Sequence, residues 1–268
     1  MTPHVLQAGT IWAGDWMQAP LEPGYTLAII DGPYGMGKAD WDRMGVEGLA
    51  DWYDPHLARV SALLAPSASV YLWNTAEGWA RIDPVMRAAG WTFRRLIVWD
   101  KGNAAGLLFA ENAGTFGEAA EYCGAYTRGA PFFTTSGAPS NLWRLAHGSW
   151  TNERVKSGVM GVAIGGTTEW AEPLHPCQKP LLFAERMIRA STRPNERILV
   201  PFGGTCREAV VCEWLARTDP AEARSYDCCE LNLDPGRDYI AAALAQIRGE
   251  DLRRRPGQEP LFAVARSP

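Results

Sequence analysis

The chain has 268 residues, of which 47% are hydrophobic and 21% charged, and its formal net charge at pH 7 is −4. This length suits one large α/β domain with a small insertion, and its longest apolar runs are too short to span a membrane. The net acidity argues mildly against a nucleic-acid partner without excluding one, because a local basic face can supply the phosphate contacts.

The N-terminus has no basic region followed by an apolar core, so we expect no signal peptide. Six cysteines show no metal-type spacing. We therefore expect reduced thiols, a cytoplasmic protein and no metal site.

A lead-in segment ends in the apolar run 26–30, which predicts a buried strand. The turn-prone residues Asp31, Gly32, Pro33 and Tyr34 follow at once. Ligands of open α/β sheets bind beyond the carboxyl ends of the strands, so this acid and this aromatic ring are candidate catalytic groups. The plainer interpretation is an ordinary tight turn in which Tyr34 only packs.

Helical spacing of apolar residues predicts an amphipathic helix over 47–64. A strand at 68–73, a helix at 78–89 closed by Gly90 and a strand at 93–99 follow. Strands that alternate with helices in this way indicate parallel βαβ units.

This alternation breaks between residues 101 and 168, which are rich in Gly, Ser, Thr and Pro apart from a predicted strand at 121–126. Such a long stretch inside a compact domain is usually functional or disordered. Residues 123–168 carry four basic residues and one acid, a balance of 4 − 1 = +3. We interpret the stretch as a recognition insert, and the alternative is a surface loop. The charged residues are Arg128, Arg144, Arg154, Lys156 and Glu153.

A strand, a glycine turn and a helix N-terminus follow in the last third of the chain. The segment 174–180 precedes a helix at 181–191, and the strand beginning at Arg197 leads to a turn with Gly203 and Gly204. A second strand at 225–229 ends in Glu230, and a helix at 235–248 follows. This arrangement is typical of sites that hold nucleotide-like ligands. The acid is placed to accept hydrogen bonds from the ribose hydroxyls, and Phe202 can cover an aromatic ring.

In this order the three stretches resemble the amino-group DNA methyltransferases of the β order. Their tetrapeptide Asp-Pro-Pro-Tyr comes first, then a target-recognition region, then His-Pro-Thr-Gln-Lys-Pro, then Asp-Pro-Phe-x-Gly-x-Gly. This chain has Asp31–Tyr34, then His175-Pro176-Cys177-Gln178-Lys179-Pro180, then Pro201–Gly204. It departs from the family at Gly32, at Val200 in place of the acid, and at Cys206 in place of the second glycine.

The resemblance implies a Rossmann-like methyltransferase fold with a central, mostly parallel sheet, helices on both faces and a small recognition insert. The catalytic half would be 1–100, the insert 101–172, the cofactor-binding half 173–250 and the C-terminal tail 251–268. The implied catalytic residues are Asp31, Gly32, Pro33 and Tyr34. The implied cofactor-binding residues are Asp15, Asp31, His175, Lys179, Pro201, Phe202, Gly203, Gly204, Thr205, Cys206, Glu230 and Asn232.

The implied activity is methyl transfer from S-adenosylmethionine to an exocyclic amine of a flipped-out base in double-stranded DNA, as in restriction-modification. Asp as the first residue of the tetrapeptide resembles the adenine-N6 enzymes, while Ser is commoner in the cytosine-N4 enzymes. The chain would be cytoplasmic, without a metal, and a homodimer could share the duplex.

Other functions stay open. The base could be cytosine N4, or the substrate RNA. The departures at Gly32, Val200 and Cys206 motivate a second hypothesis, a module that binds cofactor or nucleic acid without catalysis. A protein glutamine-amide methyltransferase shares a similar tetrapeptide, but there the cofactor glycines precede it.

Overall fold

The computed structural model describes residues 1–37, 42–100, 120–134, 140–144, 178–232 and 238–248. The chain divides into two compact units. Unit 1 comprises Met1–Leu21, Phe132–Ala138 and Trp150–Pro268, and unit 2 comprises Glu22–Pro131 and Pro139–Ser149. The first 21 residues therefore group with the C-terminal part of the chain, whereas the sequence-based division joins them to the segment 1–100.

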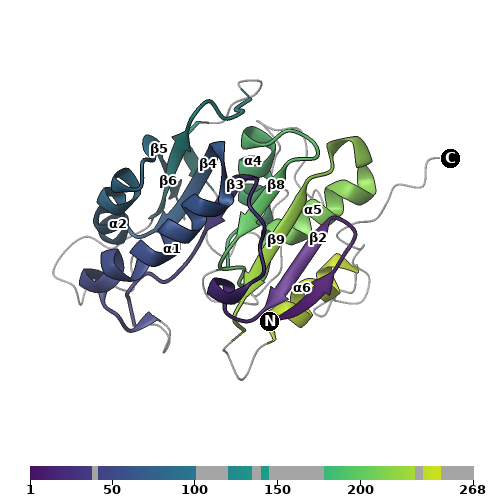
Figure 1. Ribbon diagram of the computed structural model, residues 1–268, viewed down its shortest axis with the longest axis horizontal. Helices are drawn as coiled ribbons and strands as arrows, with labels where there is room; N and C mark the ends of the chain where they lie inside the picture. Colours follow the sequence, from purple (N-terminus) through teal and green to yellow (C-terminus); the bar gives the residue numbers. More distant parts are fainter. Residues whose placement is uncertain (38–41, 101–119, 135–139, 145–177, 233–237, 249–268) are drawn as a thin grey trace. The chain divides into compact units, whose positions relative to one another are not determined.

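Unit 2 is built on β3 (Tyr25–Ile30), β4 (Leu64–Asn74), β5 (Thr92–Asp100), β6 (Ala120–Arg128) and β7 (Leu142–Arg144). Its strands lie in the order β3-β4-β6-β5-β7 (Figure 1). β3 pairs with β4, and β5 with β7, in parallel. The six strands predicted from the sequence, at 26–30, 68–73, 93–99, 121–126 and 225–229 and from Arg197 onward, are all confirmed.

The predicted parallel βαβ units are confirmed: β3 and β4 pair directly, and β4 and β5 run in the same direction although they are not neighbours. These two strands do not pair with each other, because β6 lies between them and runs antiparallel to both. Sequence periodicity identified each strand, but it cannot show that a strand formed later in the chain inserts between two earlier ones.

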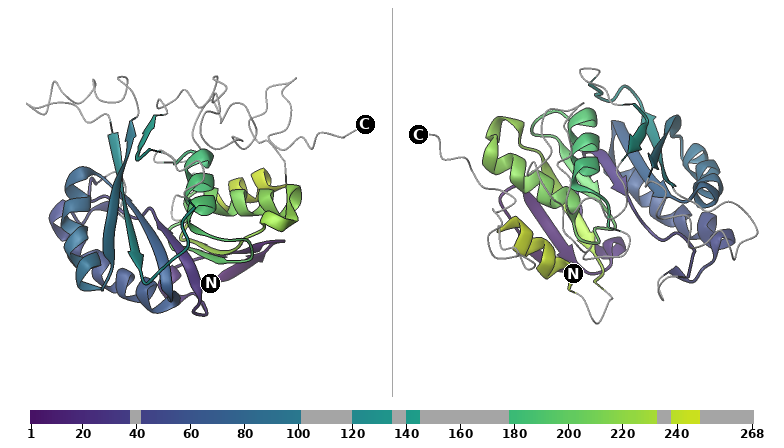
Figure 2. Two further views of the ribbon diagram at one scale, coloured as in Figure 1. Left: turned by 90° about the horizontal axis from the view of Figure 1, so that it is seen from above. Right: turned by 180° about the vertical axis from the view of Figure 1, so that it is seen from behind.

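Two helices cover one face of the unit 2 sheet (Figure 2). α1 (Leu49–Leu63), preceded by the 3-10 turn η3 (Val46–Gly48), buries Tyr53 and Leu57 on its apolar stripe. α2 (Ala76–Ala88) begins at Thr75, whose hydroxyl accepts a hydrogen bond from the backbone N–H of Gly78 at 3.1 Å. Such an N-cap satisfies one of the unpaired N–H groups of the first turn.

Unit 1 has the strand order β1-β2-β9-β8, with β1 antiparallel to β2 and the other pairs parallel. Helices α4, α5 and α6 lie on one face of this sheet (Figure 2). In chain order its elements are β1 (Thr2–Val5), β2 (Gly9–Ala13), the 3-10 turn η1 (Trp16–Gln18), α4 (Leu181–Ser191), β8 (Arg197–Val200), α5 (Arg207–Thr218), the 3-10 turn η5 (Pro220–Glu222), β9 (Ser225–Glu230) and α6 (Tyr239–Ile247).

The N-terminal residues are strands of unit 1 rather than a lead-in segment. β2 pairs with β9 in parallel, with Ala13 opposite Glu230. The buried carboxylate of Glu213 accepts hydrogen bonds from the backbone N–H of Ala8 at 2.8 Å and from the hydroxyl of Tyr226 at 3.1 Å. The bond from Ala8 joins residues 205 positions apart, and together the two bonds fix the start of the chain beside its last strand.

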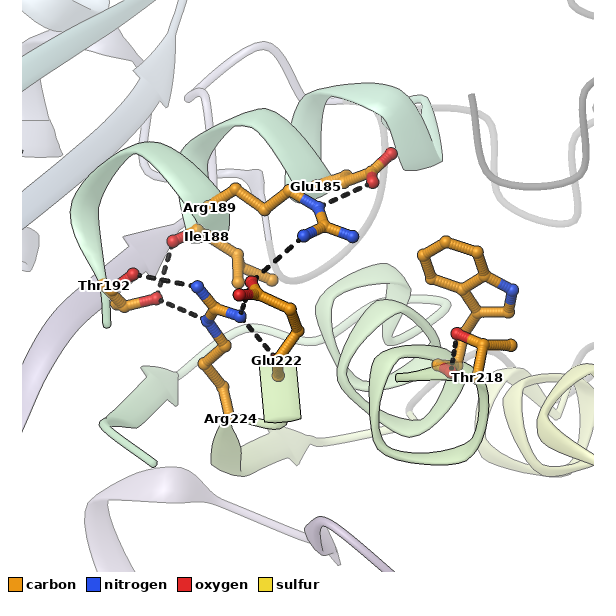
Figure 3. A network of polar contacts seen from close by, with 8 residues as sticks. Glu185, Ile188, Arg189, Thr192, Thr218, Glu222 and Arg224 are labelled. Carbon is orange, nitrogen blue, oxygen red and sulfur yellow. Dashed lines mark hydrogen bonds and ion pairs between the residues drawn. The ribbon is translucent and has the colours of Figure 1, made fainter. Parts of the chain in front are cut away.

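A polar network ties α4 to η5 and to the start of β9 (Figure 3). Arg224 is the centre: its guanidinium donates to the carbonyl oxygen of Thr192 at 3.1 Å and to the carboxylate of Glu222 at 2.6 Å. Glu222 also accepts from Arg189 at 3.2 Å, and Arg189 donates to Glu185 at 2.9 Å. Since Arg224 is buried, this pairing keeps a charge inside unit 1 at tolerable cost.

None of the helices formed by the described residues is long and apolar enough to cross a membrane. Among those residues the cysteines are all buried and free of disulfides.

Candidate active site

The tetrapeptide Asp31–Tyr34 directly follows β3, as predicted, and folds back on itself. The hydroxyl of Tyr34 lies 2.9 Å from Oδ1 of Asp31 and 3.2 Å from Oε2 of Glu121 on β6. Asp31 and Tyr34 are both partly exposed, while Gly32 and Pro33 are buried. We call the cluster of Asp31, Tyr34 and Glu121 the catalytic corner.

The backbone of the catalytic corner is fixed from two neighbouring elements. The carbonyl oxygen of Pro33 accepts hydrogen bonds from the hydroxyl of Tyr53 on α1 and from the side-chain amide of Asn74 at the end of β4, both at 3.2 Å. Burial, and next the charge of Asp31, raise the pKa of Tyr53 well above its ordinary value. Tyr53 therefore stays neutral and remains a hydrogen-bond donor to the corner.

The loop after Tyr34 is held by Asp42, which is 2% exposed. Its Oδ1 accepts from the backbone N–H of Tyr34 at 2.8 Å and of Gly35 at 2.6 Å, and its Oδ2 accepts from Met36 at 3.1 Å. Hydrogen bonds to a carboxylate are among the stronger ones in proteins. Asp42 thus fixes the chain direction on the C-terminal side of the corner.

In unit 1 the glycine turn follows β8, as predicted. Gly203 donates its N–H to the carbonyl oxygen of Cys229 at 2.7 Å, and Gly204 has a positive φ of 51°. A Cβ on Gly203 would lie 2.7 Å from Sγ of Cys228 and 3.1 Å from the Cys229 carbonyl oxygen, so only glycine fits there. Pro201, Thr205 and Cys206 are buried beside this turn.

Glu230 joins the glycine turn to the loop after β9. Its Oε2 accepts from the N–H of Gly204 at 2.6 Å, and its Oε1 accepts from the N–H of Asn232 at 2.7 Å. Burial is the largest effect and raises the pKa of Glu230. The hydrogen bonds from the N–H groups of Asn232 and, to a smaller extent, Gly204 lower it. Each carboxylate oxygen has a second lone pair, so Glu230 can still accept hydroxyl hydrogen bonds from a ligand.

Asp15 and Phe202 lie at the same end of the unit 1 sheet as Glu230. The N–H of Gly14 donates to the carbonyl oxygen of Glu230 at 2.9 Å, and Asp15 caps η1 by accepting from Met17 at 3.0 Å. Trp16 packs edge-on against Phe202, with 6.0 Å between ring centroids. The structure thus gathers Asp15, Phe202, Gly203, Gly204, Glu230 and Asn232, which we call the cofactor loops.

The remaining predicted residues lie differently. Lys179 is buried, and its carbonyl oxygen accepts from Arg207 at the start of α5 at 3.2 Å, so its backbone is fixed to unit 1. His175 lies outside the described residues. Cys206 adopts a left-handed conformation (φ 51°, ψ 44°) before α5, which a glycine would accept at lower cost.

Three residues of these sites were not among the predicted site residues. Trp16 and Glu121 carry no local pattern that marks them, and the pair Trp41-Asp42 resembles the family only weakly. Asp42 and Glu121 reach Tyr34 across 8 and 87 positions. The parallel pairing of β2 with β9 is what places Trp16 beside the cofactor loops.

Arg128 was counted in the basic excess of the recognition insert, and this assignment is wrong. Its Nη2 lies within hydrogen-bond distance of the carbonyl oxygens of Ser61, Leu64 and Ala65, at 3.0 to 3.2 Å, and its guanidinium stacks over Trp91. The charge of Arg128 therefore serves the fold of unit 2.

The family model described as DNA methylase, for N6 and N4 enzymes, matches residues 25–235, which include the catalytic corner and most of the cofactor loops. The chain belongs to this family. The predicted resemblance to amino-group DNA methyltransferases is thereby confirmed.

Relatives and solved structures agree with this membership. The DNA methylase is 28% identical over 243 residues to the Type II methyltransferase M1.MboII of Moraxella bovis. This match covers 78% of this chain and 85% of the relative. It matches the PvuII cytosine-N4-specific DNA methyltransferase with a TM-score of 0.64, at 17% identity over 93% and 89% of the two chains. It matches M1.HpyAVI, solved as a complex with SAM, with a TM-score of 0.58, at 17% identity over 88% and 98%. These likenesses confirm the methyltransferase fold.

Proposed function

We propose that this DNA methylase transfers a methyl group from S-adenosylmethionine to N6 of adenine in double-stranded DNA. The observation that carries the proposal is the catalytic corner, in which the carboxylate of Asp31 and the ring of Tyr34 are held together by a 2.9 Å hydrogen bond. Asp at the first position of the tetrapeptide resembles the adenine-N6 enzymes of the family, and this favours adenine over cytosine.

The cofactor loops fit the methyl donor. Glu230 offers further lone pairs to the ribose hydroxyls, and a Cβ on Gly204 would meet nothing within 4 Å, which leaves open space for a ligand beside the turn. Phe202 and Trp16 supply aromatic surface for the adenine ring. When bound, S-adenosylmethionine supplies an electrophilic methyl group on its sulfonium.

The catalytic corner prepares the nucleophile. The lone pair of an exocyclic amine is delocalised into the base, and accepting its N–H hydrogen bonds draws the nitrogen toward a pyramidal geometry. Asp31 and the carbonyl oxygen of Gly32 are the acceptors, and Tyr34 stacks on the base. Transfer forms the N–C bond, breaks the S–C bond and releases one amine proton, which Asp31 can accept. The base must be flipped out of the duplex to reach the corner.

The segment 101–172 is our candidate for contacts with DNA. Without Arg128, residues 129–168 still carry Arg144, Arg154 and Lys156 against Glu153. Phosphate contacts by these residues would weaken DNA binding as salt rises. A second copy of the chain, sharing the duplex, remains a prediction that sedimentation with and without DNA tests.

The test is a nucleoside digest. The enzyme is incubated with methyl-labelled cofactor and a mixed-sequence duplex, and the DNA is digested to nucleosides. Label in N6-methyladenine supports the proposal, and label only in N4-methylcytosine overturns the choice of base. Label in RNA but not in DNA assigns an RNA enzyme. Tight DNA binding without transfer, unchanged in Asp31→Ala, favours the non-catalytic binding module suggested by Gly32, Val200 and Cys206.

A further inference from the structure

The catalytic corner holds one phenol between two carboxylates. The hydroxyl oxygen of Tyr34 lies 2.9 Å from Asp31 and 3.2 Å from Glu121. A phenol has one proton and donates one hydrogen bond at a time. The two acids therefore compete for the same donor.

The position of Glu121 is set by the sheet rather than by the corner. It lies on β6, opposite Trp99 of β5, and its neighbour Tyr122 is opposite Asn74 of β4. Asn74 is also the residue that fixes the carbonyl of Pro33. Glu121 and the backbone of the tetrapeptide thus share one rigid support, and Glu121 can hold a hydroxyl at a defined place.

The competition matters because Asp31 has a second task. In the proposed reaction Asp31 accepts a hydrogen bond from the amine of the target base, whereas in this structure its Oδ1 accepts from Tyr34. A carboxylate can accept more than one hydrogen bond, but an amine bound to Asp31 weakens the attraction of that carboxylate for the Tyr34 hydroxyl, and Glu121 at 3.2 Å is a second acceptor for the same proton.

We propose that Glu121 is a positioning residue for methyl transfer: it takes over the Tyr34 hydroxyl when the base arrives, which frees Asp31 and keeps the Tyr34 ring oriented for stacking. This inference rests on the proposed function. Glu121 touches neither the base nor the cofactor in this scheme, and it acts only through the hydroxyl of Tyr34.

A double-mutant cycle tests this dependence. Glu121→Ala should lower kcat about ten-fold, the size expected for a lost hydrogen bond to a charged acceptor, and leave KM for S-adenosylmethionine unchanged. Tyr34→Phe keeps the ring and removes the hydroxyl. In the Tyr34→Phe background, Glu121→Ala should therefore cause no further loss of kcat. Glu121→Gln, which keeps an acceptor oxygen, should recover part of the activity.

The control is Glu77→Gln. Glu77 is an exposed glutamate of α2 in the same unit that pairs with Arg81 and has no role in the proposed reaction, so this variant should behave as wild type. Thermal unfolding checks each variant, and Glu121→Gln carries the cycle if Glu121→Ala does not fold. Wild-type kcat in the Glu121 variants, or losses that multiply in the double variant, overturn this inference alone. Absence of methyl transfer by the wild-type enzyme overturns the proposed function, and the inference with it.

Discussion

The backbone N–H of Gly204 lies 2.6 Å from Oε2 of Glu230, so the glycine turn after β8 is bonded directly to the acid that ends β9. The same carboxylate binds the N–H of Asn232. A single side chain therefore sets the distance between two loops that are both expected to contact the cofactor.

Glu230→Ala should weaken the binding of S-adenosylmethionine by about 1–3 kcal/mol, because it removes a charged acceptor and releases both loops. Calorimetric titration of the folded variant measures the change. Asp219→Asn, an exposed acid after α5 in the same unit, is the control. Unchanged affinity in Glu230→Ala would remove the residue from the site.

The two glycines of the turn should respond differently to alanine. In Gly203→Ala the new methyl meets Sγ of Cys228 at 2.7 Å, and we expect a loss of about 1–3 kcal/mol in the free energy of unfolding from overpacking. In Gly204→Ala the space is open, and only the positive φ of 51° costs about 1–2 kcal/mol.

Urea unfolding of both variants measures these losses, and a rescue distinguishes their causes. Adding Cys228→Ala should restore part of the stability of Gly203→Ala, because it removes the sulfur that the methyl meets. It should do nothing for Gly204→Ala. Equal behaviour of the two glycines toward this second change would contradict the steric account.

Asp31→Ala should lower kcat by about 10²–10⁴-fold, which nearly abolishes turnover, while cofactor affinity stays close to that of the wild type. The reason is that Asp31 belongs to the catalytic corner in unit 2, whereas the cofactor loops belong to unit 1. Single-turnover methyl transfer and calorimetry measure the two effects separately. Wild-type turnover in this variant would exclude Asp31 as the acceptor of the amine.

Asp42→Ala should impair catalysis without touching the reacting atoms. Three backbone N–H groups, from Tyr34 to Met36, lose their acceptor. We expect a loss of about 1–3 kcal/mol in the free energy of unfolding and a lower kcat. Asp51→Ala is the matched control, because Asp51 is exposed on α1. A wild-type kcat with intact stability would show that the loop holds its shape without Asp42.

Two glutamates of the network in Figure 3 should give opposite pH dependences. Burial raises the pKa of Glu185 above its ordinary 4.5, and its Oε2 has no hydrogen-bond partner among the residues that the structure describes. The stability that comes with this shift is present below the ordinary pKa and is lost as pH rises through the raised value. Glu185→Gln should therefore gain stability relative to wild type between about pH 4.5 and about pH 7.5.

For Glu222 the hydrogen bond from Arg224 lowers the pKa, so its contribution is present above 4.5 and is lost as pH falls through the lowered value. Glu222→Gln should therefore be less stable than wild type at about pH 7.5, and the difference should shrink in acid. Denaturant unfolding at several pH values tests both variants. The same trend in both would refute the assignment of the two environments.

Local elements were predictable because their signals are local. The helix 181–191 matches α4 to the residue, since apolar spacing and Pro180 mark it within one short window. Thr75 as an N-cap moves the start of α2 two residues before the predicted one. The pairing of β2 with β9 and the insertion of β6 depend on contacts across distant parts of the chain, and no periodicity records them.

The candidate site divides in the same way. Asp31 and Gly204 follow strongly apolar runs and Glu230 ends the next predicted strand, so the sequence shows where they lie. Asp42 and Glu121 reach the corner only through the tertiary fold. Arg128 shows the converse error, because a charge count cannot tell a cation that contacts DNA from one that caps backbone carbonyls.

The pairing of β2 with β9 also bears on biosynthesis. Trp12 and its partner Asp227 are 215 positions apart, and at roughly 5–20 residues per second a ribosome needs about 10–40 s to make the intervening chain. Unit 2 is translated within that interval, and until β9 is made β2 lacks the strand that pairs with it in the folded protein. Moving the first 21 codons behind the last helix, as a circular permutation, would remove this delay and let the second polypeptide segment complete its sheet as it emerges.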